Sequence, residues 1–216
     1  MRDLDDRQYA PATERNREPI LEVLLQVLPP TGTVLEISSG TGEHAIFLAP
    51  RLAPRQWLPS DPNPIARASI AAWKKHRPAE NLHDPIALDV RDAVWIEQNS
   101  HSISAIVNIN MIHIAPWDAC LGLMSGAQRI LSNGGILYLY GPFKRGDQHT
   151  APSNAAFDQS LRSQNSDWGI RDLEQVIAVA QAQNFTLLQV YEMPANNLSV
   201  VFQAGGITDL SSAANP

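Results

Sequence analysis

A short turn rich in glycine and hydroxyl side chains follows directly on an apolar run of strand character, Thr33 to Ile37. The turn begins at Ser38 and ends with Gly40-Thr41-Gly42. Glycine lets the backbone bend sharply and lets a ligand lie against the main chain, where a side chain would obstruct it. The turn is therefore a candidate cofactor site, although a purely structural strand-to-helix turn has a similar composition.

Acidic residues accompany the ends of successive apolar runs. Glu36 lies just before the turn, Asp61 follows residues 56–58, and Asp89-Val90 follows residues 86–88. Two carboxylate oxygens can accept hydrogen bonds from both hydroxyls of a ribose. Each aspartate alone is more often a cap or a turn residue. The set in this order indicates a site for a nucleoside-containing cofactor.

The segment after residues 103–109 carries the candidates for catalysis. His113 could act as a general base, because its ordinary pKa lies near neutrality, or it could simply hydrogen-bond in the wall of a pocket. Asn110 could orient a cofactor or substrate group, or cap the end of the strand. Tyr9 joins these two as a third catalytic candidate, because the N-terminal segment is expected to fold over the same end of the sheet.

A further set of polar and aromatic residues could line a substrate site. A guanidinium grips carboxylate or phosphate with two parallel hydrogen bonds. The competing interpretations are a solvated helix entry for the arginines, a core position for the tryptophan and a turn for the asparagines. The candidate substrate residues are Arg15, Asn16, Tyr140, Trp168, Arg171 and Asn196.

These candidates require a sheet that brings strand ends together. Short β-like apolar runs alternate with longer helical patterns, which predicts an α/β fold with a mostly parallel sheet and helices on both faces. Seven strands are expected, at residues 33–37, 56–58, 86–88, 103–109, 136–140, 186–192 and 198–203. After the fifth strand we expect a long polar loop that leads to a helix near 171–183. The connection 193–197 is short enough only for an antiparallel pair. We expect one domain over 1–204, with 1–17 as an N-terminal lid segment and 205–216 as a flexible tail.

Composition excludes several classes of function. The chain has 16 basic and 22 acidic residues, and a net charge of −6 without a long basic cluster disfavours nucleic acid as a partner. No apolar run approaches the ~20 residues that span a bilayer, and the charged N-terminus is no signal peptide. One cysteine and scattered histidines predict neither a disulfide nor a metal site. We expect a cytoplasmic protein with no membrane partner, and no particular oligomeric state is indicated.

The glycine turn resembles the class I S-adenosylmethionine-dependent methyltransferase motif, an acidic residue followed by alternating glycines. Glu36 matches the acidic position, Gly40 and Gly42 match two glycines, and Ser38 replaces the usual first glycine. The resemblance implies that Asp61 holds the ribose and that Asp89-Val90 contacts adenine. A dinucleotide-binding Rossmann enzyme is the alternative, but its full G-x-G-x-x-G is missing.

A wider set of segments is similar to the domain-of-unknown-function family 938, the methyltransferase-like protein 26 group. The matching segments are 9–17, 36–44, 110–113, 140–143, 153–158, 168–172 and 193–197. The resemblance implies a Rossmann-like class I methyltransferase fold that uses S-adenosylmethionine. We expect a methyltransferase that acts on a small anionic or zwitterionic molecule. A non-catalytic S-adenosylmethionine-binding module and a protein methyltransferase are the alternatives.

Overall fold

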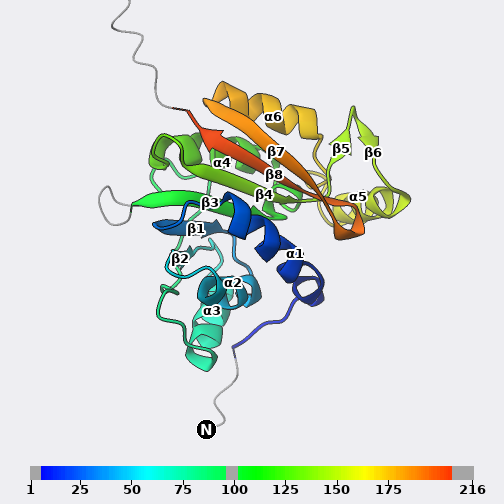
Figure 1. The fold of residues 1–216 in the computed structure, drawn as a ribbon. Helices are drawn as coiled ribbons and strands as arrows, with labels where there is room; N and C mark the ends of the chain where they lie inside the picture. The colour runs from blue at the N-terminus through cyan, green and yellow to red at the C-terminus, as the bar shows by residue number, and fades with distance from the viewer. Residues whose placement is uncertain (1–5, 96–101, 206–216) are drawn as a thin grey trace, which may run out of the picture.

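The computed structural model describes residues 6–95 and 102–205 (Figure 1). Its helices are α1 (Pro11–Val27), α2 (Glu43–Arg51), α3 (Pro64–His76), α4 (Trp117–Ile130), α5 (Pro152–Gln164) and α6 (Leu173–Ala182). Single 3-10 turns occur at η1 (Met111–His113) and η2 (Pro194–Asn196). The main sheet contains β1 (Thr33–Ile37), β2 (Gln56–Pro59), β3 (Ile103–Ile109), β4 (Ile136–Gly141), β7 (Phe185–Met193) and β8 (Asn197–Ala204), and a separate hairpin pairs β5 (Lys144–Arg145) with β6 (Gln148–His149).

The main sheet has the order β2-β1-β3-β4-β8-β7. β2, β1, β3 and β4 run parallel, and β8 pairs antiparallel with both β4 and β7. This confirms the predicted α/β class and the antiparallel C-terminal pair. The sheet has six strands rather than seven, because the segment expected at 86–88 makes only the isolated bridge Ser60↔Ile86. Pro85 precedes this bridge and has no N–H to donate to a ladder.

Two helices differ from the sequence-based expectation. α1 begins at Pro11, because a proline is well suited to the first turn of a helix, so Arg15 and Asn16 of the predicted lid segment lie on this helix. α5 was expected to be part of a long loop. Its buried residues include Asn154 and Asp158, so hydrophobic periodicity does not reveal it. Residues 1–5 of the predicted lid and 206–216 of the predicted tail lie outside the described residues.

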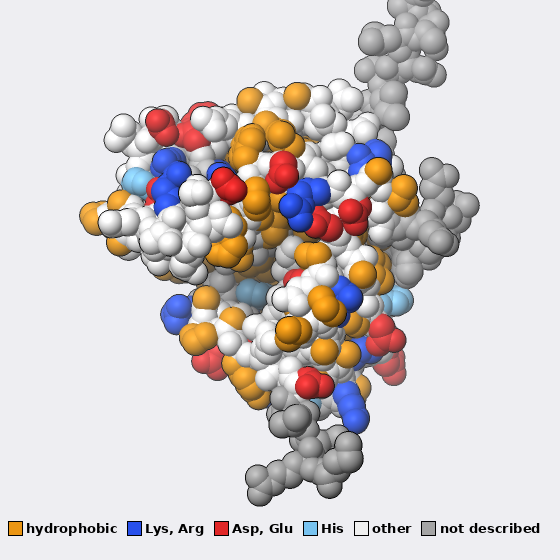
Figure 2. Space-filling view, turned by 180° about the vertical axis from the view of Figure 1, so that it is seen from behind, with side chains coloured by type: hydrophobic (Ala, Val, Ile, Leu, Met, Phe, Trp, Pro, Cys, Tyr) orange, Lys and Arg blue, Asp and Glu red, His pale blue; other side chains and the backbone are white. Residues whose placement is uncertain are grey.

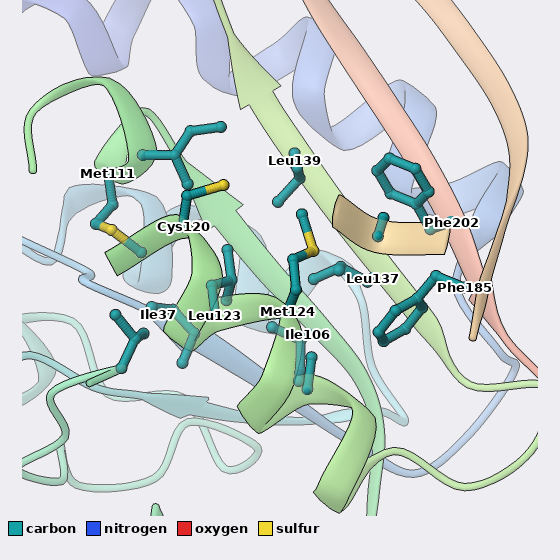
Figure 3. Close-up of a cluster of buried hydrophobic side chains, with 14 of the residues drawn as sticks. Ile37, Ile106, Met111, Cys120, Leu123, Met124, Leu137, Leu139, Phe185 and Phe202 are labelled. Carbon is teal, nitrogen blue, oxygen red and sulfur yellow. The ribbon is translucent and has the colours of Figure 1, made fainter. Parts of the chain in front are cut away.

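Helices cover both faces of the sheet (Figure 1), and its strands are mostly buried except for the edge strand β7. On one face its side chains pack against α4 and α6, and on the other against α1 and α2. Figure 3 shows the first cluster, in which Ile106 and Leu137 of the sheet lie beside Leu123 and Met124 of α4. Cys120 belongs to this cluster, and burial raises the pKa of its thiol to about 12, so the thiol is structural.

The parallel strands bring four chain segments to one edge of the sheet. Register pairs Glu36 with Pro59 and Ile109 with Tyr140, so β1, β2, β3 and β4 end close together. The loops that follow these ends are the usual place for a ligand in an open α/β sheet. Among the described residues, no helix has the length and apolarity needed to cross a membrane.

Candidate functional site

The glycine turn after β1 adopts a left-handed backbone at three positions. φ is 55° at Ser38, 56° at Gly40 and 88° at Gly42. A Cβ on Gly40 would meet no heavy atom within 4 Å, whereas a Cβ on Gly42 would lie 2.9 Å from Cα of Ile70. Gly42 is therefore needed for packing against α3. Gly40 leaves open space over the main chain that a ligand could fill.

Asp61 joins the turn to the end of β2. Its Oδ2 accepts a hydrogen bond of 3.0 Å from the amide of Gly40, and its Oδ1 accepts one of 2.8 Å from the amide of Asn63. The side chain is buried. Each carboxylate oxygen retains further acceptor capacity, so Asp61 can hold the turn and still accept from ribose hydroxyls.

Glu36 lies below the turn rather than in open space. Its carboxyl group is 2% exposed, and Nε1 of Trp57 donates to its Oε2 over 3.0 Å. Burial raises the pKa of Glu36 to about 7, although hydrogen bonds from Trp57 and Ser39 act in the opposite direction. Glu36 therefore supports the turn from beneath and is poised to change charge near neutrality.

Asp89 and Val90 follow the segment that bridges to β2. Both oxygens of Asp89 already contact Arg91, at 3.0 Å from Nε and 2.6 Å from Nη2. This contact holds the pKa of Asp89 below its usual range. The side chain of Val90 is buried, and its carbonyl accepts from Nε1 of Trp95. Any adenine contact through Asp89 would share the carboxylate with Arg91.

A cavity of about 480 Å³ lies beside these strand ends. Figure 2 shows the surface hollowed on this side of the molecule, next to the lobe that contains α5, β5 and β6. Five of the residues predicted for the site line the cavity, and they are Arg15, Asn16, Asn110, Tyr140 and Asn196. α5 and the β7–β8 connection supply further lining residues, which belong to segments of the family resemblance but were not predicted to bind substrate, chiefly Ser153, Asn154, Phe157, Pro194 and Asn197.

A hydrogen-bond chain connects this cavity to the glycine turn. Oδ1 of Asn16 lies 2.9 Å from Nε2 of His44, which is two residues beyond Gly42. Asn16 also hydrogen-bonds to Tyr140, and burial raises the pKa of that phenol. Burial lowers the pKa of His44 to about 4. His44 was not predicted as a site residue, and its only sequence signal is its place in the first turn of the helix after the glycines.

The surroundings of His113 weigh against a general base, and that role stays a prediction. The side chain is fully buried, and its Nδ1 accepts from the backbone amide of Arg171 over 3.3 Å. Burial lowers the pKa of His113 to about 3, and the charge of Arg171 acts in the same direction. The neutral ring therefore carries its proton on Nε2, a buried atom with no hydrogen-bond partner in the described structure.

Asn110 and Gly141 lie against the free nitrogen of His113. A Cβ on Gly141 would lie 2.5 Å from Nε2 of His113 and 3.1 Å from Oδ1 of Asn110. Asn110 is held in a left-handed conformation with φ of 65°, and its backbone N–H donates to the backbone carbonyl of Tyr140 over 2.8 Å. The side chains of His113 and Asn110 thus pack closely against Gly141 at the end of β4, where only a glycine leaves them room.

Four residues predicted for catalysis or substrate binding do not line this cavity, namely the buried His113 and three others. Tyr9 is 62% exposed, packs edge-on against Trp73 and lines a different cavity between α1, α2 and α3. Arg171 donates to the carbonyls of Ile112, Ala115 and Asp167, so its guanidinium fixes local backbone. Trp168 is half-buried and does not line the cavity.

No group of three or more potential metal ligands occurs within 6–95 and 102–205.

Comparison with known proteins places the chain in context. The family model described as protein of unknown function, DUF938, matches residues 7–204. Human N-acetylserotonin methyltransferase, solved in complex with S-adenosylmethionine, superposes with a TM-score of 0.74 at 13% identity, covering 90% of this chain and 53% of that chain. An O-methyltransferase family protein from Burkholderia thailandensis gives a TM-score of 0.75 at 14% identity, covering 90% of this chain and 57% of that one.

A third solved structure extends the same pattern. The O-methyltransferase family 2 protein from Planctomyces limnophilus, in complex with apigenin, gives a TM-score of 0.72 at 16% identity, with 89% and 59% coverage. The present chain thus spans little more than half the length of these three proteins. The comparison establishes the Rossmann-like fold of class I methyltransferases.

Proposed function

The chain belongs to the family described as protein of unknown function, DUF938, and from this premise we propose that it is an S-adenosylmethionine-dependent methyltransferase acting on a small anionic or zwitterionic molecule. The observation that carries the proposal is the open space over Gly40, bordered by the carboxylate of Asp61. The fold-level likeness to methyltransferases supports it.

The residues around the glycine turn suit the proposed cofactor. The main chain at Ser38, Gly40 and Thr41 would hold the methionine end, and Asp61 would accept hydrogen bonds from the ribose hydroxyls. Asp89 and Val90 would border the adenine, and Glu36 supports the turn from beneath. S-adenosylmethionine supplies an electrophilic methyl group when it is bound. The protein then needs to hold an acceptor in line with that methyl group and to exclude water.

The acceptor site of this proposal is the cavity of about 480 Å³. Its lining includes Asn16, which contacts His44 on the helix after the glycine turn, and Asn110 at the end of β3. These contacts border both the cofactor region and the cavity. Asn110 orients reacting groups, whereas Tyr9, Trp168 and Arg171 have no direct part.

Calorimetric titration with S-adenosylmethionine and S-adenosylhomocysteine tests the proposal. We expect micromolar binding that is abolished in Gly40→Arg and weakened in Asp61→Ala. Gly146→Arg is the matched control, because Gly146 has a φ of 55° and equally open surroundings in the β5–β6 turn. If the folded protein binds neither ligand, the methyltransferase proposal is wrong.

A non-catalytic cofactor-binding module is the second candidate. It is favoured by the two histidines near the site, because the pKa of each is too low for a neutral-pH base. Turnover to S-adenosylhomocysteine in the presence of an acceptor separates the two candidates. A protein methyltransferase is less favoured, because the cavity of about 480 Å³ has the size of a small-molecule site.

A further inference from the structure

The described lining of the acceptor cavity carries positive but no negative charge. Arg15 is the one cation among its described lining residues, and none of them is a carboxylate. The remaining polar lining consists of amides and hydroxyls, namely Asn16, Asn110, Tyr140, Ser153, Asn154, Asn196 and Asn197. A ligand with a negative charge is therefore matched electrostatically, and a lone ammonium is not.

Arg15 is also the cavity's available source of strong hydrogen-bond donors. Its guanidinium makes no hydrogen bond or ion pair within the part of the chain that the structure describes. By contrast, Nδ2 of Asn154 donates to Thr150 and to the carbonyl of Asn196. Nδ2 of Asn197 donates to the carbonyls of Pro194 and Ala195. An anionic group entering the cavity would thus be held mainly by Arg15, in the two-pronged geometry that suits a carboxylate.

Among its described residues, the cavity contains no group placed to remove a proton from an acceptor. Nε2 of His44 is paired with Asn16, and Nδ1 of His113 is occupied by a backbone amide. Tyr140 stays a neutral phenol at ordinary pH, because burial raises its pKa. An ammonium or an alcohol must lose a proton before or during methyl transfer. A carboxylate is already ionised at neutral pH and needs no such help.

Building on the proposed function, we infer that the acceptor is a small organic acid that is methylated on its carboxylate oxygen. A carboxylate oxygen forms the bond to the methyl carbon while the sulfur–methyl bond breaks and its electron pair stays on sulfur. The acid loses its negative charge, the sulfonium loses its positive charge, and no proton moves. The product is a methyl ester. Phe157, Pro142 and Pro194 give the cavity an apolar surface for the body of the acid.

The first test measures binding and does not depend on turnover. Ligand-observed NMR compares benzoate and phenylacetate with benzyl alcohol and benzylamine, with and without S-adenosylhomocysteine. We expect the acids to bind selectively and to lose roughly tenfold to a hundredfold in affinity in Arg15→Met, the loss expected for a charge-assisted contact. Arg17→Met is the matched control, because Arg17 lies on the same helix but lines the other cavity. Failure of both acids to bind, or equal binding to Arg15→Met, overturns the inference.

The second test identifies the product. S-adenosylmethionine labelled in its methyl group is incubated with the wild-type protein and each probe, and the product is treated with alkali. A methyl ester releases its label as volatile methanol, whereas an N-methyl or ether product keeps it. Alkali-stable product from an amine or alcohol, with the acids inert, overturns the inference and leaves the proposed function standing. If calorimetry shows that the folded protein does not bind the cofactor, the proposed function is wrong. Binding of the acids at Arg15 is then still measured by NMR without cofactor.

Discussion

Oδ1 of Asn16 lies 2.9 Å from Nε2 of His44, and this hydrogen bond ties helix α1 to the first turn of helix α2. Asn16 is 9% exposed and also contacts Tyr140 at the end of β4. One amide side chain therefore connects the glycine turn, the acceptor cavity and the sheet.

Replacing this amide should cost both stability and acceptor binding. Asn16→Ala leaves two polar partners incompletely paired, so we expect a loss of about 1–3 kcal/mol in the free energy of unfolding. Urea unfolding measures the loss. Gln26→Ala on the same helix is the control, because its only side-chain bond is exposed and its removal should change stability by less than about 0.5 kcal/mol. Equal effects of the two substitutions would remove the linking role of Asn16.

Acidification should destabilise the fold through His44. The pKa of His44 falls from 6.5 to about 4 on folding because of burial, so the unfolded state binds more protons between these values. The contribution is complete above pH 6.5 and is lost as the pH falls toward 4. At pH 5 roughly 1–2 kcal/mol of this contribution to the free energy of unfolding has been lost. Unfolding at pH 7 and pH 5 should show a smaller pH dependence in His44→Gln than in the wild type, and identical dependences would contradict this account.

The two glycines of the turn should respond differently to alanine. Gly42→Ala places a Cβ against the backbone of Ile70 at a φ of 88°, so we expect a loss of at least 2 kcal/mol from clash and strain together. Gly40→Ala has a φ of 56° but meets no atom, and strain alone should cost about 1–2 kcal/mol. Its main effect should be weaker binding of S-adenosylhomocysteine, measured by calorimetry. Full affinity in Gly40→Ala would place the cofactor away from this residue.

Glu36 should make the protein less stable in mild alkali. Its pKa rises from 4.5 to about 7 on folding, so its contribution is present below pH 4.5 and is lost as the pH rises through 7. Glu36→Gln stays neutral and can still accept from Trp57. We compare the free energy of unfolding of this variant with that of the wild type. From pH 4.5 to pH 8 the difference should shift by up to about 3 kcal/mol in favour of the variant. Denaturant unfolding at both pH values measures this difference. A difference that does not change with pH would contradict a raised pKa for the buried Glu36.

Arg171 should act on stability and not on ligand recognition. Its guanidinium donates to three backbone carbonyls, at 2.9 Å from Ile112, 2.6 Å from Ala115 and 2.9 Å from Asp167. A lysine cannot reproduce this fork, so Arg171→Lys should lose about 2–3 kcal/mol. Arg129→Lys, at an exposed site, is the control. A selective loss of acid binding in folded Arg171→Lys would restore the substrate role that the sequence suggested.

The sequence by itself determined the alternating α/β order, the antiparallel C-terminal pair and the position of the glycine turn. These are local properties, because apolar periodicity and glycine content act over a few neighbouring residues. The same reasoning missed α5, whose buried face includes Asn154 and Asp158, and it expected a strand at 86–88 where Pro85 interrupts the ladder.

Only the tertiary structure decided where the candidate residues lie relative to one another. Arg15, Asn110 and Asn196 are far apart in the chain, and strand register and helix packing bring them to one cavity. The same packing buries His113 and removes its basicity, because the surroundings of an ionisable group set its pKa. A histidine in a sequence carries its ordinary pKa, and only burial and its hydrogen-bond partners determine whether it can accept a proton.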